Sequence, residues 1–200
     1  MPFPRLSALF NNCALHALTP EICAEVKKYA VNTNYDNQHN PEYLRLKGIF
    51  ADYYGFGEFD WEYFAEILDF YNPFDAQLIL GPVLRVFMKE SLRRNEFTPW
   101  LAEVDGISLE QYIDNYTETS TALGGRYRSL APDELSTHVA SPLGLSLCYH
   151  PQEGETQQFR AENPIAEVTI YHVGDLEGKA SGHWERVANV TDPECIDYQH

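Results

Sequence analysis

The sequence predicts an α+β fold, because helical and strand patterns occupy different parts of the chain. Between about residues 20 and 125, apolar residues recur three and four positions apart, which is the spacing of one helix face. After Gly125 the pattern changes to short alternating stretches typical of strands. The length of 200 residues is enough for one substantial core, so we expect a single domain, 1–200, with room for an inserted lobe.

Several stretches in the front of the chain have helical spacing and are bounded by a capping residue, a proline or a glycine: 14–18, 20–30, 41–54, 61–71, 74–94 and 108 to about 124. Thr19 and Asp60 are candidate N-caps, and Pro20 and Pro41 fit the first helical position. We expect an interruption at Gly81-Pro82, because a proline inside a helix removes a backbone hydrogen bond. The stretch 32–40 is polar and is predicted to be a loop.

The back of the chain is predicted to contain one short helix, 132–139, and strands at 145–149, 165–173 and 183–190. In the second strand, alternation assigns Val168 and Ile170 to one face, and Glu167 and Tyr171 to the other. The strand that begins with His183 comes last in the chain, whereas Cys13 comes before the long helices.

The charge balance limits the classes of partner. The chain has 30 acidic and 14 basic residues, for a formal net charge of −16. We expect no nucleic-acid binding, which depends on Lys and Arg contacts to phosphate, and we expect a basic partner to be favoured instead. The alternative is that the acidity only keeps the protein soluble.

The cysteines and the apolar runs indicate the compartment. Cys13, Cys23, Cys148 and Cys195 form no Cys-x-x-Cys pair and no dense framework, which favours free thiols in a reducing compartment. No apolar run approaches the ~20 residues of a membrane span, so we expect a soluble protein without membrane insertion. The first ten residues lack the apolar core of a signal peptide, and export by a machinery that recognises a different targeting signal is the alternative.

Cys13 is the candidate nucleophile, because a polar stretch meets a short apolar helix there. A helix N-terminus stabilises a thiolate. Asn11 and Asn12 favour a tight turn, since asparagine tolerates left-handed backbone. Backbone N–H groups of Asn11, Asn12 and Cys13 would then form an oxyanion hole. The alternative is that Cys13 is a small buried apolar residue, as most free cysteines are.

His183 is the candidate base for this thiol, although only the fold can bring the two together. Gly182 precedes it and has no side chain, so another group can approach the histidine closely. Glu185 lies two positions on, on the same face of the strand, and is the candidate third member that holds the imidazole. Asn189 and Asn12 are alternatives for that role, and a purely structural histidine is the alternative for His183 itself.

Metal or cofactor binding is not expected. Cys13, His16, Cys23 and His183 can be drawn as a zinc site, but their spacings match no common zinc pattern. The chain has no Gly-x-Gly-x-x-Gly motif and no P-loop.

The two ends of the chain resemble the OTU family of cysteine proteases. Asn-Cys-Ala-Leu-His-Ala-Leu over residues 12–18 resembles the family's cysteine block. Residues 134–139 and 145–149 resemble the helix and strand before the histidine block, and residues 165–171 followed by Gly182-His183-Trp184 resemble that block. The resemblance covers about 5–20 and 130–192. The family's Asp-Gly before the cysteine turn is replaced by Phe10-Asn11, so an aspartate that often supports the oxyanion region is missing.

The resemblance implies an OTU or papain-like core with a small mixed β-sheet, and an inserted helical lobe over about 32–125. Such a lobe is similar to that of Lot-type OTU effectors, which intracellular bacterial pathogens deliver into the host cytoplasm. It implies a deubiquitinase that hydrolyses isopeptide bonds in polyubiquitin, with the lobe gripping ubiquitin. The alternatives are a deamidase or acyl transferase with the same Cys-His pair, a binding module for ubiquitin or a basic protein, and an inactive relative.

Overall fold

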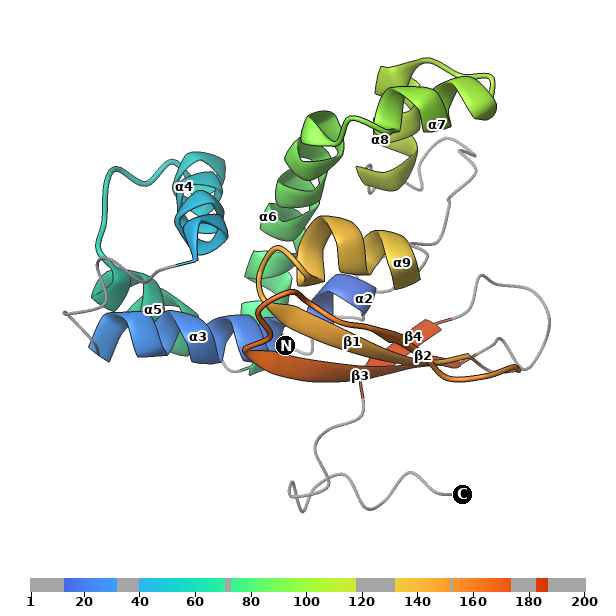
Figure 1. Ribbon diagram of the computed structural model, residues 1–200. Coiled ribbons are helices and arrows are strands. Elements are labelled where there is room, and N and C mark those ends of the chain that lie inside the picture. The colour runs from blue at the N-terminus through green and yellow to red at the C-terminus, as the bar shows by residue number, and fades with distance from the viewer. Residues whose placement is uncertain are drawn as a thin grey trace, which may run out of the picture.

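The computed structural model describes residues 13–31, 40–70, 73–117, 132–151, 153–173 and 183–186. Its fold is α+β, as predicted: a series of helices is followed by a small sheet (Figure 1). Some predicted features lie outside the described residues, namely Asn11, Asn12, Asn189, most of the 32–40 loop, the helix end near 124 and the strand beyond 186.

The helices largely follow the predicted stretches: α2 (Cys13–His16), α3 (Thr19–Val31), α4 (Pro41–Tyr54), α5 (Trp61–Phe70), α6 (Pro73–Arg94), α7 (Thr98–Val104), α8 (Leu109–Thr117), α9 (Pro132–Leu135) and the π-helical turn η2 (Ser136–Ala140). Local signals explain the bounds of α4 and α5. Pro41 opens α4, and Gly55 closes it with a φ of 70°. Asp60 caps α5, since its Oδ1 accepts a hydrogen bond from the Tyr63 N–H at 2.8 Å.

Two helix predictions were wrong. α6 continues through Gly81-Pro82 without a break. Leu80, Val83 and Leu84 around the proline are completely buried, and this packing offsets the missing backbone hydrogen bond. Thr19 is the first residue of α3 and does not cap it, because its hydroxyl has no hydrogen-bond partner in the described part of the chain.

The sheet is small and mixed, as the resemblance implied. It contains β1 (Leu145–His150), β2 (Gln157–Phe159), β3 (Ala166–Val173) and β4 (His183–Arg186), in the order β2-β1-β3-β4. β1 and β3 are parallel, whereas β2 and β4 run antiparallel to their neighbours. β2 and the short helix α7 were not predicted. The three strands that were predicted are all present.

The helices lie on one side of the sheet (Figure 1), where η2 contacts β1 and α2 contacts β4. On β3, Val168 and Ile170 are buried, whereas Glu167 and Tyr171 are exposed, as the alternation predicted. The residues of the core form one continuous cluster that extends from α2 through the helices to β3. α6 is at its centre, in contact with α2, α3, α4, α5, α8 and η2.

None of the helices in the described ranges is long and apolar enough to cross a membrane.

Candidate active site

α2 and β4, which carry the two main predicted site residues, are neighbours in the fold. α2 begins at Cys13 and lies against both β4 and α6. β4 begins at His183. The fold therefore brings together two backbone segments from opposite ends of the sequence, and each segment contains one of the two candidate catalytic residues.

The position of α2 is fixed by burial of the residues that follow Cys13. Ala14, Leu15, His16 and Leu18 are all buried. The Leu18 N–H donates to the Leu15 carbonyl at 3.1 Å, and the turn continues directly into α3. A short helix held in the core in this way gives the backbone at its first residue a defined position.

The position of β4 is fixed by its register with β3. His183 is paired with Val173, and Glu185 is paired with Tyr171. His183 and Glu185 are thus two positions apart on one strand, as the sequence predicted. The thiol–imidazole contact, the role of Glu185 and the oxyanion hole at Asn11, Asn12 and Cys13 stay predictions, as does Asn189 as the alternative third member.

Cys23 is not part of this junction. It is half-buried in α3, and burial raises the pKa of its thiol to about 11 from an ordinary value of 9.0. Its thiol is therefore protonated at neutral pH and is a poor nucleophile. Within the described residues, no group of three or more His, Cys, Asp or Glu side chains is arranged to hold a metal ion.

A second cysteine–histidine pair, which the sequence reasoning did not single out, lies on β1. The Cys148 Sγ is 3.6 Å from His150 Nε2, and His150 Nδ1 is 2.8 Å from the Thr156 hydroxyl. The His150 ring also stacks on Tyr171, with centroids 4.4 Å apart. The Cys-x-His spacing was the available signal, because positions two apart on a strand share a face.

The surroundings of Cys148 make it a poor nucleophile despite this contact. Burial, and then the negative charge of Glu167, raise the pKa of the thiol above its ordinary value. Cys148 is buried in the middle of β1, which has a neighbouring strand on each side. We assign the pair a structural role, with the imidazole held between a thiol, a hydroxyl and an aromatic ring.

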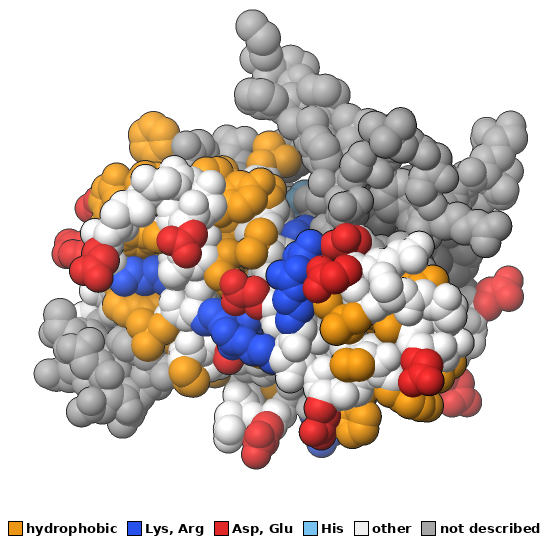
Figure 2. Space-filling model, turned by 90° about the horizontal axis from the view of Figure 1, so that it is seen from above, with side chains coloured by type: hydrophobic (Ala, Val, Ile, Leu, Met, Phe, Trp, Pro, Cys, Tyr) orange, Lys and Arg blue, Asp and Glu red, His pale blue; other side chains and the backbone are white. Residues whose placement is uncertain are grey.

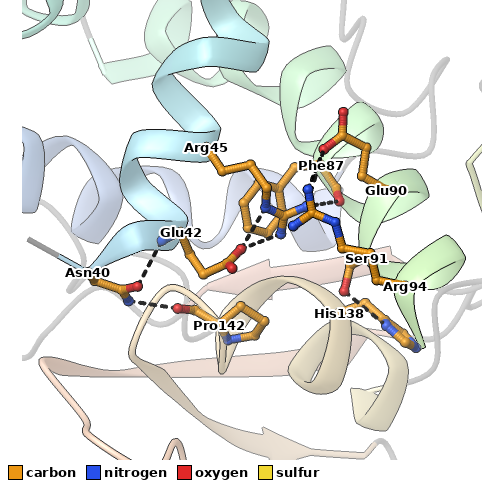
Figure 3. Close-up of polar contacts among 9 residues, drawn as sticks. All are labelled: Asn40, Glu42, Arg45, Phe87, Glu90, Ser91, Arg94, His138 and Pro142. Carbon is orange, nitrogen blue, oxygen red and sulfur yellow. Dashed lines mark hydrogen bonds and ion pairs between the residues drawn. The ribbon is translucent and has the colours of Figure 1, made fainter. Parts of the chain in front are cut away.

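Polar contacts tie α4 to α6 and to the turn that precedes β1 (Figure 3). Arg45 on α4 lies over the Phe87 ring on α6 at 3.7 Å and donates to Glu42 at 2.6 Å. Asn40, just before α4, donates to the Pro142 carbonyl at 2.7 Å, next to the start of β1. α4 is therefore anchored both to α6 and to the turn that leads into β1.

A scan of protein-family models, a search of curated proteins and a search of solved structures each found no match to the chain. Its function is therefore inferred from its residues and its geometry.

Proposed function

We propose that this protein is a cysteine-dependent isopeptidase that cleaves ubiquitin chains and has an OTU-like core. One observation carries the proposal: α2, which begins at Cys13, lies against β4, which begins at His183. A thiol nucleophile and its base must be close in space although they are far apart in sequence. This is possible only if the elements that carry them, α2 and β4, are neighbours. The small mixed sheet with helices over one face is compatible with such a core.

The proposed reaction has two stages. The Cys13 thiolate attacks the carbonyl carbon that joins the ubiquitin C-terminus to a lysine, while backbone N–H groups at Asn11, Asn12 and Cys13 hold the oxyanion. His183 gives its proton to the lysine amine, which leaves as the C–N bond breaks. Water, deprotonated by the same imidazole, then hydrolyses the thioester and frees the ubiquitin carboxylate and the thiol. Glu185 orients the imidazole, with Asn189 as the alternative.

The charge of the chain supports ubiquitin as the substrate. Ubiquitin's binding face is apolar and ringed by basic residues, and this chain has a net charge of −16. Opposite charges accelerate encounter between proteins and fix their relative orientation. The resemblance to Lot-type effectors extends the proposal to a secreted bacterial protein that acts in the host cytoplasm.

The test is cleavage of a panel of di-ubiquitins by the wild type, Cys13→Ala and His183→Ala, with Cys148→Ala as the matched thiol control. We expect the wild type and Cys148→Ala to cleave, and Cys13→Ala to be inactive. A ubiquitin probe with a C-terminal electrophile should form a covalent adduct with the wild type and not with Cys13→Ala. Activity that survives in Cys13→Ala, or that disappears in Cys148→Ala while the fold is retained, would contradict the assignment of the nucleophile.

A binding module for ubiquitin or another basic protein is the second candidate. The surface of α4 and the segment after it favours it, because Leu44, Tyr53 and Phe56 are exposed there. Binding of ubiquitin without cleavage or covalent capture would select this function. A deamidase or acyl transferase would be captured through Cys13 and would leave di-ubiquitin intact.

A further inference from the structure

The α4 hollow is a surface depression between α4 and the segment that leads to α5. It has a volume of about 450 Å³. Its lining includes apolar side chains from α4 and from this segment, together with Asp52 and Glu58. Figure 2 shows hydrophobic side chains gathered on the α4 side of the molecule, with acidic side chains among them.

Gly48 lines the α4 hollow, and close packing within the described part of the chain does not require a glycine there. It lies in the middle of α4 (Pro41–Tyr54), where glycine weakens a helix relative to alanine. No described atom outside its own helix turn lies within 4 Å of the place that a Cβ would occupy. A glycine with no internal steric requirement is typical of a place where another molecule approaches the backbone.

The walls beside Gly48 are apolar and exposed. Leu44 is 50 % exposed and Phe56 is 38 % exposed. Phe56 is nevertheless held in place, because its ring stacks parallel to that of the buried Phe50, with centroids 5.9 Å apart. The α4 hollow is thus a preformed apolar site that suits an aliphatic side chain.

The charges at the α4 hollow select a basic partner. Asp52 and Glu58 are exposed, and neither carboxylate has a hydrogen-bond or ion-pair partner among the described residues. Lys47 also lines the α4 hollow, but its ammonium group lies over the rings of Phe59 and Trp61, 5.2 and 5.1 Å from their centroids. An incoming lysine or arginine therefore meets two carboxylates that lack a counterion from the chain.

We propose that the α4 hollow is the docking site for a protein face that presents an aliphatic side chain beside lysine or arginine. The aliphatic side chain sits over Gly48 between Leu44 and Phe56, and the basic residues face Asp52 and Glu58. The identity of the partner rests on the proposed function, under which it is ubiquitin. The α4 hollow then determines how the substrate is held, at a distance from the reacting bond.

The experiment uses the full chain carrying Cys13→Ala, titrated with ubiquitin by calorimetry. Gly48→Leu fills the α4 hollow and should weaken binding at least about tenfold, whereas Gly48→Ala should have a smaller effect. Neither substitution should lower the thermal midpoint, because both replace a mid-helix glycine. Asp52→Lys should weaken binding severalfold, while the matched Glu103→Lys should not. Glu103 is also an exposed acid in the last turn of a helix, α7, on the other side of α6 from α4 (Figure 1).

The outcomes separate this inference from the proposed function. Unchanged ubiquitin affinity in Gly48→Leu overturns the docking site, and the isopeptidase proposal still stands if the chain with Cys13 intact cleaves di-ubiquitin. Weakened affinity in Gly48→Leu, in a chain that binds ubiquitin but never cleaves it, supports the docking site and overturns the isopeptidase. A Cys13→Ala chain that does not bind ubiquitin overturns ubiquitin as the occupant, and cleavage by the chain with Cys13 intact then decides the isopeptidase proposal separately.

Discussion

The α2–β4 junction and strand β1 each carry a cysteine and a histidine, but the two pairs are related differently. At the junction, Cys13 and His183 are the first residues of two adjoining elements. On β1, Cys148 and His150 are in direct contact, but the thiol is buried in the middle of a strand and its pKa is raised. Contact with an imidazole therefore does not by itself make a nucleophile. The position of the sulfur and the charges around it decide whether a thiolate forms.

Replacing each of the two histidines by alanine should produce the largest difference in kcat between the α2–β4 junction and β1. His183→Ala should lower kcat for di-ubiquitin cleavage by ~10²–10⁴, because it removes the proposed general acid and base. His150→Ala should leave kcat within about twofold, since His150 has no part in the proposed reaction. Initial cleavage rates at saturating substrate measure both effects. Equal losses in the two variants would place the chemistry elsewhere.

The pH dependence of the alkylation rate of each thiol compares Cys13 with Cys148 and Cys23. Cys13 should react with iodoacetamide at neutral pH, as expected of a thiolate stabilised by its surroundings. Cys148 and Cys23 should react at least about tenfold more slowly, and should accelerate only above the ordinary thiol pKa, because burial keeps both protonated. Peptide mapping by mass spectrometry after timed labelling reports each site. Rapid labelling of Cys148 at neutral pH would remove the distinction.

Substitution of two glycines compares the start of the sheet with helix α4. Gly144, just before β1, has a φ of 73°, and an added Cβ would lie 3.2 Å from the Asn163 carbonyl oxygen. Gly144→Ala should therefore lower the free energy of unfolding by ~1–2 kcal/mol. Gly48→Ala should instead raise it by up to ~1 kcal/mol, because α4 is helical there and the space is open. Urea unfolding followed by circular dichroism gives both values, and equal signs would contradict the comparison.

His138 on η2 should give the smallest effect, as a change in pH dependence. Burial lowers the pKa of this imidazole below its ordinary value of 6.5, and Nδ1 is 3.3 Å from the Ser91 hydroxyl. Below pH 6.5 the unfolded chain binds a proton that the folded chain does not, so stability falls as the pH falls. His138→Gln should reduce this acid-side slope in urea titrations between pH 5 and 7. An unchanged slope would show that other groups cause it.

Local signals predicted much of the fold. Pro41 and Gly55 gave the correct bounds of α4, and Asp60 gave the correct start of α5, because capping depends on a few adjacent residues. The continuity of α6 through Pro82 could not be predicted, since it depends on burial against helices that are distant in sequence. β2 was missed for the same reason: it is short and polar, and it exists through its pairing with β1.

The candidate site was predictable only in part. Cys13 and His183 each have informative neighbours in the sequence, but the adjacency of α2 and β4 follows from the register of β4 on β3 and from the packing of α2. The contact between Cys148 and His150 requires that the segment be a strand. The contact between His150 and Thr156 requires, in addition, the position of the segment that follows β1. The sequence therefore indicated which side chains could react, whereas tertiary structure decided which of them lie next to each other.

The place of β4 at one end of the strand order β2-β1-β3-β4 has a kinetic consequence. Among the described strands it is bound to a single neighbour, so its amide protons should exchange with deuterium faster than those of β1, which has two. Transient release of this one strand would separate His183 from α2 while the buried cluster stays intact. If the proposed isopeptidase activity depends on His183, mild denaturant should accordingly abolish it before the molecule unfolds globally.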